Sequence, residues 1–380
     1  VTARAKELKA EGADIISFSA GEPDFDTPKE IKRAAIQAIE AGHTKYTPVG
    51  GINELKDAII EKLKIDHNIA YTREEILVSC GGKHSFYNLC QALLNPGDEV
   101  IVPSPYWVSY PPMIQLADGE AKILTTTEAT GFKVTPKSFK DAIGERTRAI
   151  VINSPSNPTG AAYTSSEIAE IAKVAVENEV LIISDEIYEN IYYGDDKIVS
   201  AASISEEAKA ITIVLNGVSK AYSMTGWRIG YAAGPKELIS AMTRVQSQST
   251  SNPASVSQWA SVEALKGPKD KIDKMTKLFK SRRDLMVSGL NDIEGIKCLV
   301  PDGAFYVFAD VSELYGKKFE GNTINNSIEL SKFLLESAGV AVVPGSAFGD
   351  DDHVRLSYAC GDDDIKNGIN KIKEAVSRLS

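Results

Sequence analysis

Short runs of apolar and β-branched residues alternate along this chain with longer amphipathic segments, and this alternation is the feature that most constrains its fold. The runs occupy residues 75–80, 99–105, 148–155, 180–186, 211–220 and 228–234. Helical periodicity marks residues 29–42, 52–65 and 165–179, and Ser165 and Ser166 are the expected N-caps of the last segment. Strands that alternate with helices predict an α/β fold, in which a mainly parallel central sheet has helices on both faces.

A change of pattern near residue 268 indicates a second domain. The apolar runs stop around the stretch KGPKDK, and a long amphipathic helix is expected at roughly 272–290. We expect an N-terminal segment 1–28 that belongs to a smaller α+β domain, a large domain 29–268, and the C-terminal part of the small domain at 269–380. A chain of 380 residues is long enough for two cores.

Composition disfavours several classes of function. A formal net charge of −10 does not suit a protein that binds nucleic acid through its phosphate backbone. No apolar run approaches the roughly 20 residues of a membrane helix. The scattered cysteines (Cys80, Cys90, Cys298 and Cys360) and the histidines lack metal-ligand spacing, so we expect no metal and a reducing, cytoplasmic compartment. The sequence begins with Val1 rather than methionine, so we expect the natural N-terminus to lie further upstream.

One lysine stands directly at the end of an apolar run. Lys220 follows the strand-like residues 211–219 and precedes Arg228 in the stretch GVSKAYSMTGWRIG. Most lysines are solvated surface charges, but a desolvated lysine near a second cation can lose its proton near neutral pH and act as a covalent nucleophile. The planar fork of Arg228 suits a phosphate. A carbonyl cofactor that carries a phosphate would use both residues, and pyridoxal 5′-phosphate is such a molecule.

Two further stretches fit the same cofactor. Asp185 ends a strand-like run, where its carboxylate would keep a pyridine nitrogen protonated, and Tyr188 could donate a hydrogen bond to the phenolic oxygen of the ring. The alternative is that Asp185 is a helix N-cap and Tyr188 a packing residue. Gly81 and Gly82 lie between a strand and a helix, where free N–H groups suit a phosphate, although such a pair is more often only a turn.

The segments around these residues resemble the class I aminotransferase family, and the likeness covers almost the whole chain. Besides the lysine stretch it includes SAGEPDFDTP (19–28), KYTPVGG (45–51), SPYWVSYP (104–111), NSPSNPTG (153–160), SDEIYE (184–189), GAFY (303–306) and HVRLSYA (353–359). Within the family, the bacterial-type aspartate aminotransferases are the most similar group. The resemblance implies the fold-type I architecture of pyridoxal phosphate enzymes and a homodimer with shared active sites.

The resemblance also implies roles for individual residues. Lys220 matches the lysine that bonds to the cofactor and then moves the proton, and Asp185 matches the partner of the pyridine nitrogen. The implied cofactor-binding positions are Gly82, Lys83, Trp107, Asn157, Asp185, Tyr188, Ser219, Lys220 and Arg228, together with Tyr46 from the neighbouring subunit. The implied substrate-binding positions are Gly21, Lys83, Trp107, Asn157 and Arg355. Arg355 would hold the α-carboxylate and Lys83 the distal carboxylate of aspartate. Without the resemblance, Trp107 could equally be a core tryptophan, and Arg355 would be read as a surface arginine.

The implied activity is transamination between L-aspartate and 2-oxoglutarate, which gives oxaloacetate and L-glutamate. Small amino acids and 2-oxo acids are therefore the expected partners. The main alternative is another class I aminotransferase that acts on prephenate, aromatic amino acids or alanine. A cofactor-binding sensor of this fold is disfavoured because no basic DNA-binding segment is present. A nicotinamide dehydrogenase is disfavoured because no GxGxxG motif follows an early strand.

Overall fold

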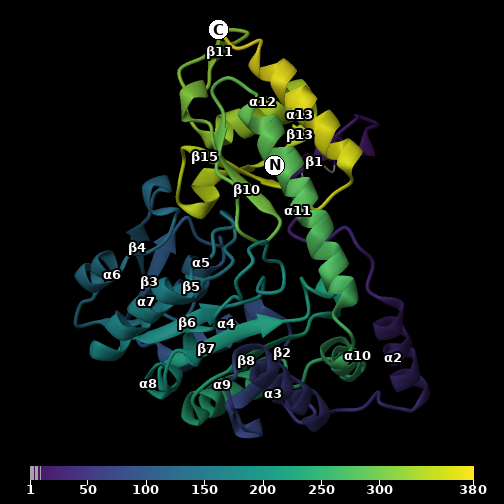
Figure 1. Ribbon diagram of the computed structural model, residues 1–380, viewed down its shortest axis with the longest axis vertical. Coiled ribbons are helices and arrows are strands. Elements are labelled where there is room, and N and C mark those ends of the chain that lie inside the picture. Colours follow the sequence, from purple (N-terminus) through teal and green to yellow (C-terminus); the bar gives the residue numbers. More distant parts are fainter. Residues whose placement is uncertain (1–3, 5–6, 9) are drawn as a thin grey trace.

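A seven-stranded sheet forms the centre of the larger part of the protein. The computed structural model describes Arg4, Glu7, Leu8 and residues 10–380 (Figure 1). The strand order is β2-β8-β7-β6-β5-β3-β4. The strands β3 to β7 pair in parallel, and β8 runs antiparallel to both β2 and β7. Their bounds are Ile76–Ser79 (β2), Glu99–Ser104 (β3), Glu120–Thr125 (β4), Thr147–Asn153 (β5), Leu181–Asp185 (β6), Thr212–Gly217 (β7) and Gly230–Ala233 (β8).

The mainly parallel α/β sheet expected from the sequence is therefore confirmed, and each of the six apolar runs contains one strand. The strand β4 was not expected, because its side chains are only partly buried and its sequence EAKILT lacks a long apolar run. A strand at the edge of a sheet needs less apolar surface than a central strand, which explains why the pattern missed it.

Helices cover both faces of this sheet, because alternate strand residues point to opposite sides. Val151 and Ile183 pack against α4, α5 and α9, whereas Ile150 and Ile182 pack against α6, α7 and α8. The helices α3 and α10 cover the second face near β2 and β8. The helices of this part are Lys29–Glu40 (α2), Asn53–His67 (α3), Gly82–Leu93 (α4), Tyr110–Gln115 (α5), Pro136–Ala142 (α6), Ser165–Glu177 (α7), Glu206–Ala210 (α8), Lys236–Ser249 (α9) and Ser255–Lys266 (α10).

The expected caps of α7 are wrong by one residue. Thr164 is the N-cap, and its side chain accepts a hydrogen bond from the backbone N–H of Glu167. The Glu167 carboxylate in turn accepts from the Thr164 N–H at 2.7 Å, which completes a capping box. Ser165 and Ser166 therefore lie outside the N-cap position.

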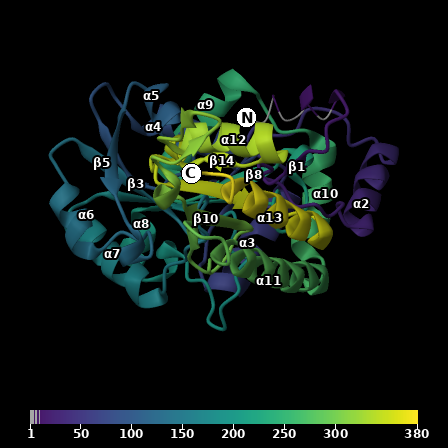
Figure 2. The ribbon, with the colours of Figure 1, turned by 90° about the horizontal axis from the view of Figure 1, so that it is seen from above.

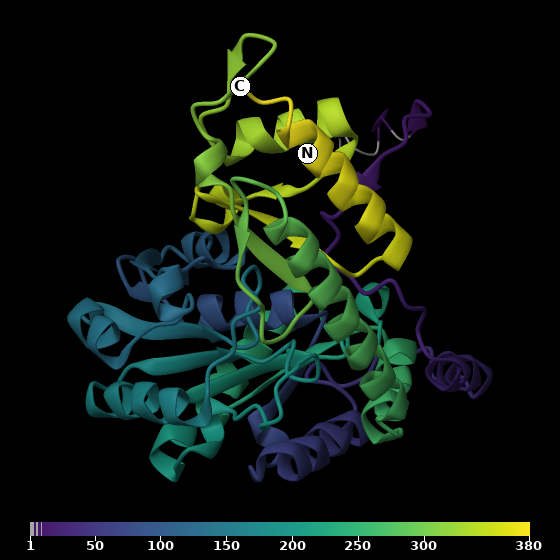
Figure 3. The same cartoon turned by 45° about the horizontal axis from the view of Figure 1, so that its top comes forward.

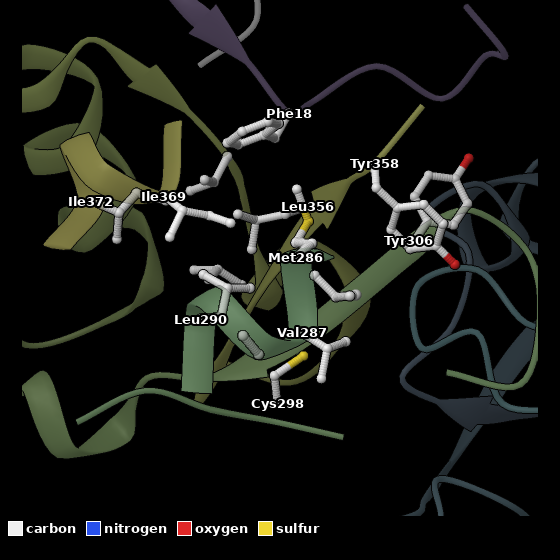
Figure 4. Packing of buried hydrophobic residues seen from close by; sticks show 14 of the residues in the cluster. Phe18, Met286, Val287, Leu290, Cys298, Tyr306, Leu356, Tyr358, Ile369 and Ile372 are labelled. Atoms are coloured by element: carbon white, nitrogen blue, oxygen red, sulfur yellow. The ribbon is translucent and has the colours of Figure 1, made fainter. Parts of the chain in front are cut away.

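The C-terminal part is built on a four-stranded antiparallel sheet in the order β14-β15-β10-β9. Figure 4 shows its apolar core, where Met286, Val287 and Leu290 of the helix Asp270–Asn291 pack in one cluster with Leu356 of the sheet. The elements are Asp270–Asn291 (α11), Lys297–Cys298 (β9), Tyr306–Asp310 (β10), Lys318–Phe319 (β11), Asn322–Thr323 (β12), Ser327–Ala338 (α12), Val340–Ala341 (β13), Val343–Pro344 (β14), His353–Ser357 (β15) and Asp362–Val376 (α13).

Two segments join the two parts. The long helix α11 runs from the region of α10 up to the C-terminal sheet (Figures 1 and 3). The strand β1, Ile16–Ser17, pairs in parallel with β13, and Phe18 is buried in the C-terminal core. The chain then passes to α2, beside α10 and at a distance from α6 and α7 (Figure 2). The N-terminal segment thus contacts the C-terminal part, whereas the domain boundaries 28/29 and 268/269 stay a prediction.

Within the described part of the chain, every helix is too short or too polar to cross a membrane.

Candidate active site

A cavity of 520 Å³ lies where the strands β5, β6 and β7 end and the C-terminal sheet approaches them. Eleven of the twelve residues expected at the site line this cavity: Gly21, Gly82, Lys83, Trp107, Asn157, Asp185, Tyr188, Ser219, Lys220, Arg228 and Arg355. The twelfth, Tyr46, does not line it and is 93% exposed. Ligands of open α/β sheets bind at the carboxyl ends of the strands, so the position of the cavity is the one that this fold favours.

Lys220 follows β7 by three residues and is half-buried at the wall of the cavity. Its Nζ donates a hydrogen bond of 2.5 Å to the carbonyl oxygen of Gly21. Burial, and after it the positive charge of Arg355, lower the pKa of Lys220 to about 8. The charge of Arg228 also lowers this pKa, although by less than the charge of Arg355. A substantial fraction of Lys220 is therefore neutral near pH 8, as a nucleophilic amine requires.

Asp185 is the last residue of β6, and its carboxylate lines the cavity. The hydroxyl of Tyr110 donates a hydrogen bond of 2.6 Å to Asp185 Oδ2, and the N–H of Ile187 lies 3.3 Å from Oδ1. Burial raises the pKa of Asp185, although both hydrogen bonds and the charge of Lys220 oppose this rise. A turn follows the strand rather than a helix, so the reading of Asp185 as a helix N-cap is wrong.

Tyr188 lies on the turn after β6 and contacts the C-terminal sheet. Its hydroxyl is 2.8 Å from the hydroxyl of Tyr306, which belongs to β10. The ammonium of Lys220 lies 5.8 Å from the centre of the Tyr188 ring. Tyr188 is buried but lines the cavity, so it is not only a packing residue.

Arg228 and the start of α4 together form one corner of the cavity. The guanidinium of Arg228 donates to the carbonyl oxygens of Thr225 and Cys80, at 2.8 and 3.3 Å. Gly81 has a φ of +92°, and a Cβ atom there would lie 2.4 Å from the Arg228 guanidinium, so only glycine fits. The helix α4 begins at Gly82, which lines the cavity together with Lys83 and Arg228, and free N–H groups at a helix start suit an anion.

Arg355 occupies the side of the cavity that the C-terminal sheet provides. It is 7% exposed, so the reading as a surface arginine is wrong. One terminal nitrogen donates to Asn157 Oδ1 at 2.9 Å and the other to the Ser19 carbonyl at 3.1 Å. Its Nε is buried and has no hydrogen-bond partner among the described residues. A buried guanidinium with an unused donor suits a carboxylate ligand.

Lys83 and Trp107 lie together on another wall. The ammonium of Lys83 is 5.0 Å from the centre of the Trp107 ring, and this ring packs edge-on against Tyr110 at 5.2 Å. Trp107 is only partly buried and lines the cavity, so it is not a core tryptophan. A cation and an indole at one wall can bind an anionic group and stack on a flat ring.

A buried ion cluster lies behind the Asp185–Tyr188 turn. The Glu189 carboxylate pairs with the ammonium of Lys62 and with His67 Nε2, the latter at 2.6 Å, and accepts a hydrogen bond of 2.7 Å from Asn216. Although burial opposes it, the bond to Glu189 and the charge of Glu186 raise the pKa of His67. His67, Glu186 and Glu189 are close enough to hold a metal ion, but Lys62 already neutralises Glu189. The cluster therefore fixes Glu189, which directly follows Tyr188, and it connects to the cavity wall through Asn216.

Ten of the residues that line the cavity were not expected there, and two of these ten are tyrosines, Tyr110 and Tyr306. Both lie in stretches that carried the family resemblance, SPYWVSYP and GAFY. In the sequence, each of them could be noticed only as a tyrosine expected to be buried. A buried tyrosine hydroxyl needs a hydrogen-bond partner, which would mark it as a candidate for a polar role. Which partner each of them has depends on the tertiary structure.

Comparison with known proteins gives a consistent result. The family model described as aminotransferase class I and II matches residues 13–372. An aspartate aminotransferase of a Bacillus species is 50% identical over 379 residues, which are 100% of this chain and 94% of the relative. An aspartate/prephenate aminotransferase of Cereibacter sphaeroides is 49% identical over 382 residues, with 100% of this chain and 96% of the relative covered. The crystal structure of the aspartate aminotransferase from Rhizobium meliloti superposes with a TM-score of 0.97 at 46% identity, covering 100% of this chain and 95% of that one.

Proposed function

The chain belongs to the class I and II aminotransferase family, and from this premise we propose that it transfers the amino group between L-aspartate and 2-oxoglutarate, giving oxaloacetate and L-glutamate. The observation that supports the proposal best is that Lys220, Asp185, Arg228 and Arg355 line one cavity. A nucleophilic amine, a buried carboxylate and two guanidinium groups are the set that an amino acid and a phosphorylated aldehyde would need.

Pyridoxal 5′-phosphate is the cofactor of this family, and the residues of the cavity fit it. Lys220 has the lowered pKa that bonding to an aldehyde requires. The close approach of Arg228 to Gly81 leaves a corner with convergent donors for the phosphate. Asp185, held by Tyr110, would face the pyridine nitrogen, and the Tyr188 hydroxyl would face the phenolic oxygen. Ser219 and Trp107 would complete the contacts to the phosphate and the ring.

When bound, the cofactor bonds to the amino nitrogen and withdraws electrons from the substrate α-carbon. Asp185 would keep the proton on the ring nitrogen, because a carboxylate raises the pKa of a neighbouring cation. Lys220 Nζ, once the substrate nitrogen has replaced it, would take the proton from the α-carbon and return it to the carbon on the other side of that nitrogen, C4′ of the cofactor. Burial of the cavity wall helps Lys220 to stay neutral for this step.

Two cationic residues would bind the two carboxylates of aspartate. Arg355, with Asn157 and the backbone at Gly21 beside it, would hold the α-carboxylate through its planar fork. Lys83, over the Trp107 ring, would hold the distal carboxylate. An amino acid without a second carboxylate would lose the second contact, so the position of Lys83 favours a dicarboxylic substrate.

A second candidate activity is the amination of prephenate. The Cereibacter sphaeroides relative that is 49% identical is an aspartate/prephenate aminotransferase. Prephenate also carries two carboxylates, so Arg355 and Lys83 could bind it in the same way. Rates with prephenate in place of 2-oxoglutarate, at equal concentrations and with aspartate as donor, would separate the two activities.

The assembly and the compartment belong to the same proposal. Tyr46 is 93% exposed and lies outside the cavity, as expected of a residue that reaches the phosphate in a neighbouring subunit of a homodimer. The four cysteines are free, which suits the reducing cytoplasm. The division into a large domain 29–268 and a small domain 1–28 plus 269–380 would place the cavity between the two.

Half-reactions test the proposed function directly. The purified protein should bind pyridoxal 5′-phosphate and give a yellow chromophore that aspartate and glutamate, but not alanine or phenylalanine, convert rapidly to the aminated cofactor. Reduction with borohydride followed by peptide mapping should place the cofactor on Lys220. Labelling of another lysine, or equal rates with all four amino acids, would contradict the proposal.

A further inference from the structure

We propose that Tyr306 is a positioning residue that directs the hydroxyl proton of Tyr188 into the cavity, toward the phenolic oxygen of the cofactor. This inference rests on the proposed function and adds a residue to it. Tyr306 lies in the GAFY stretch, to which the sequence assigned no role. It belongs to β10 of the C-terminal sheet, whereas Tyr188 follows β6 of the central sheet, so the contact joins the two parts of the protein.

The hydrogen bond between the two tyrosines has an ordinary length and is buried. Their hydroxyl oxygens are 2.8 Å apart, and the rings meet edge-on with their centres 5.8 Å apart. Tyr306 is 1% exposed and Tyr188 is 4% exposed. Each hydroxyl carries one proton, so one of them donates and the other accepts. Among the described residues, Tyr188 is the one hydrogen-bond partner of the Tyr306 hydroxyl.

The geometry allows either direction, but the use of both protons favours Tyr306 as the donor. Gly21 lies beside the Tyr306 hydroxyl, since a Cβ atom at Gly21 would lie 3.4 Å from that oxygen. If Tyr306 donates to Tyr188, the proton of Tyr188 is free to meet an acceptor in the cavity, and both protons are used. If Tyr188 donates to Tyr306, an acceptor in the cavity would face a lone pair of Tyr188 instead. A chain of hydrogen bonds that all run in one direction is also stronger than its separate members.

Arg355 strengthens Tyr306 as a donor. Its guanidinium lies 4.4 Å from the centre of the Tyr306 ring, because Arg355 and Tyr306 project from neighbouring strands that pair at Phe308 and Arg355. Burial raises the pKa of Tyr306, but the charge of Arg355 and the bond to Tyr188 oppose this rise. Tyr306 thus touches both the residue expected to hold the substrate carboxylate and the residue expected to contact the cofactor.

The test removes only one oxygen atom. Tyr306→Phe keeps the ring beneath Arg355 but cannot donate to Tyr188. A hydrogen bond to an anionic oxygen stabilises its deprotonated form, so a weaker bond from Tyr188 should raise the pH midpoint of the bound chromophore by about half a unit or more. We expect kcat to fall several-fold, while KM for aspartate stays within about twofold because the carboxylate contact remains.

Tyr358→Phe is the matched control. Tyr358 is also buried in the C-terminal core, and its hydroxyl bonds to Tyr193 and to the Ala304 carbonyl, away from the cavity. Figure 4 shows both tyrosines at the same end of this core. The Tyr358→Phe control should leave the pH midpoint of the bound chromophore unchanged. If Tyr306→Phe gives the midpoint of the wild-type protein, the inference is wrong.

A second variant covers the case in which Tyr306→Phe does not fold. 3-Fluorotyrosine at position 306 keeps the shape of the side chain and has a more acidic hydroxyl, so it should lower the midpoint rather than raise it. No shift, or a shift upward, would overturn the inference. The two proposals fail in different ways. If the wild-type protein binds no pyridoxal 5′-phosphate, the proposed function is wrong. If the wild-type chromophore titrates and both Tyr306 variants have the same pH midpoint as the wild type, only the role of Tyr306 is wrong.

Discussion

The hydroxyl of Tyr110 donates a hydrogen bond of 2.6 Å to the carboxylate of Asp185, at the point where the strand β6 opens into the cavity. Tyr110 is buried and Asp185 is partly buried, so this bond holds the carboxylate in one orientation and stabilises its negative charge. The contact joins the start of α5 to the end of β6, which are 75 residues apart in the chain.

Replacing Tyr110 with phenylalanine should therefore weaken the cofactor site while keeping the fold. Asp185 would lose its strongest partner, at a cost of about 1–3 kcal/mol for a bond to a charged group. We expect weaker binding of pyridoxal 5′-phosphate, measured by equilibrium dialysis, and a lower kcat. Tyr163→Phe is a suitable control, because that hydroxyl accepts from the Val134 N–H outside this cavity. Equal losses in both variants would indicate a general packing effect.

The lowered pKa of Lys220 predicts a pH dependence. In the protein without cofactor, Lys220 must be neutral to attack the aldehyde, and burial lowers its pKa to about 8. The rate of covalent cofactor binding should therefore rise with pH and level off above about 8. Stopped-flow absorbance between pH 6 and about 10 would measure it. A midpoint near the ordinary lysine value of 10.5 would show that the amine is not perturbed.

Arg355→Lys should impair every amino acid substrate. Lysine keeps the charge but cannot form the planar, two-point contact with a carboxylate. We expect kcat/KM to fall by about 2–5 kcal/mol in activation free energy, or roughly 30- to 4,000-fold, for aspartate and alanine alike. The spectrum of the bound cofactor should stay the same, because the predicted cofactor contacts are made by other residues. A loss confined to aspartate would reassign Arg355 to the distal carboxylate.

Lys83→Ala should change the substrate preference instead. The ammonium of Lys83 lies over Trp107 and is expected to meet the distal carboxylate of aspartate. Its removal should lower kcat/KM for aspartate about tenfold or more and leave the slow reaction with alanine nearly unchanged. The ratio of the two half-reaction rates measures this effect. If the preference for aspartate persists in full, the assignment of the pocket is wrong.

The buried pair of His67 and Glu189 predicts how stability depends on pH. Although burial opposes it, the bond to Glu189 raises the pKa of His67 above its ordinary value of 6.5. The stabilisation is complete below about pH 6.5 and disappears as the pH rises through the higher pKa of the folded state. As the pH rises from about 6.5 to above the pKa of His67 in the folded protein, the free energy of unfolding in urea should fall by about 1–3 kcal/mol more for the wild-type protein than for His67→Gln. If the free energy of unfolding changes with pH in the same way for both proteins, His67 does not carry the stabilising positive charge.

The sequence by itself determined the class of fold and most of the site. Alternating apolar and amphipathic segments gave the order of strands and helices, because burial on a sheet or on one helix face requires those periods. Lys220 and Asp185 could be found because each stands at or near the end of an apolar run, and the ends of parallel strands meet at one edge of the sheet. The caps of α7 and the edge strand β4 were missed, because single side-chain bonds and partial burial leave little trace in the pattern.

Only the tertiary structure decided which side chains meet across the cavity. Tyr306 contacts Arg355 because β10 pairs with β15, and it contacts Tyr188 because the C-terminal sheet lies over the end of β6. Tyr110 reaches Asp185 through the position of α5. The reason is physical: periodicity tells which face of an element is buried, whereas a hydrogen bond depends on where a residue far away in the chain places its oxygen, to within a few tenths of an ångström.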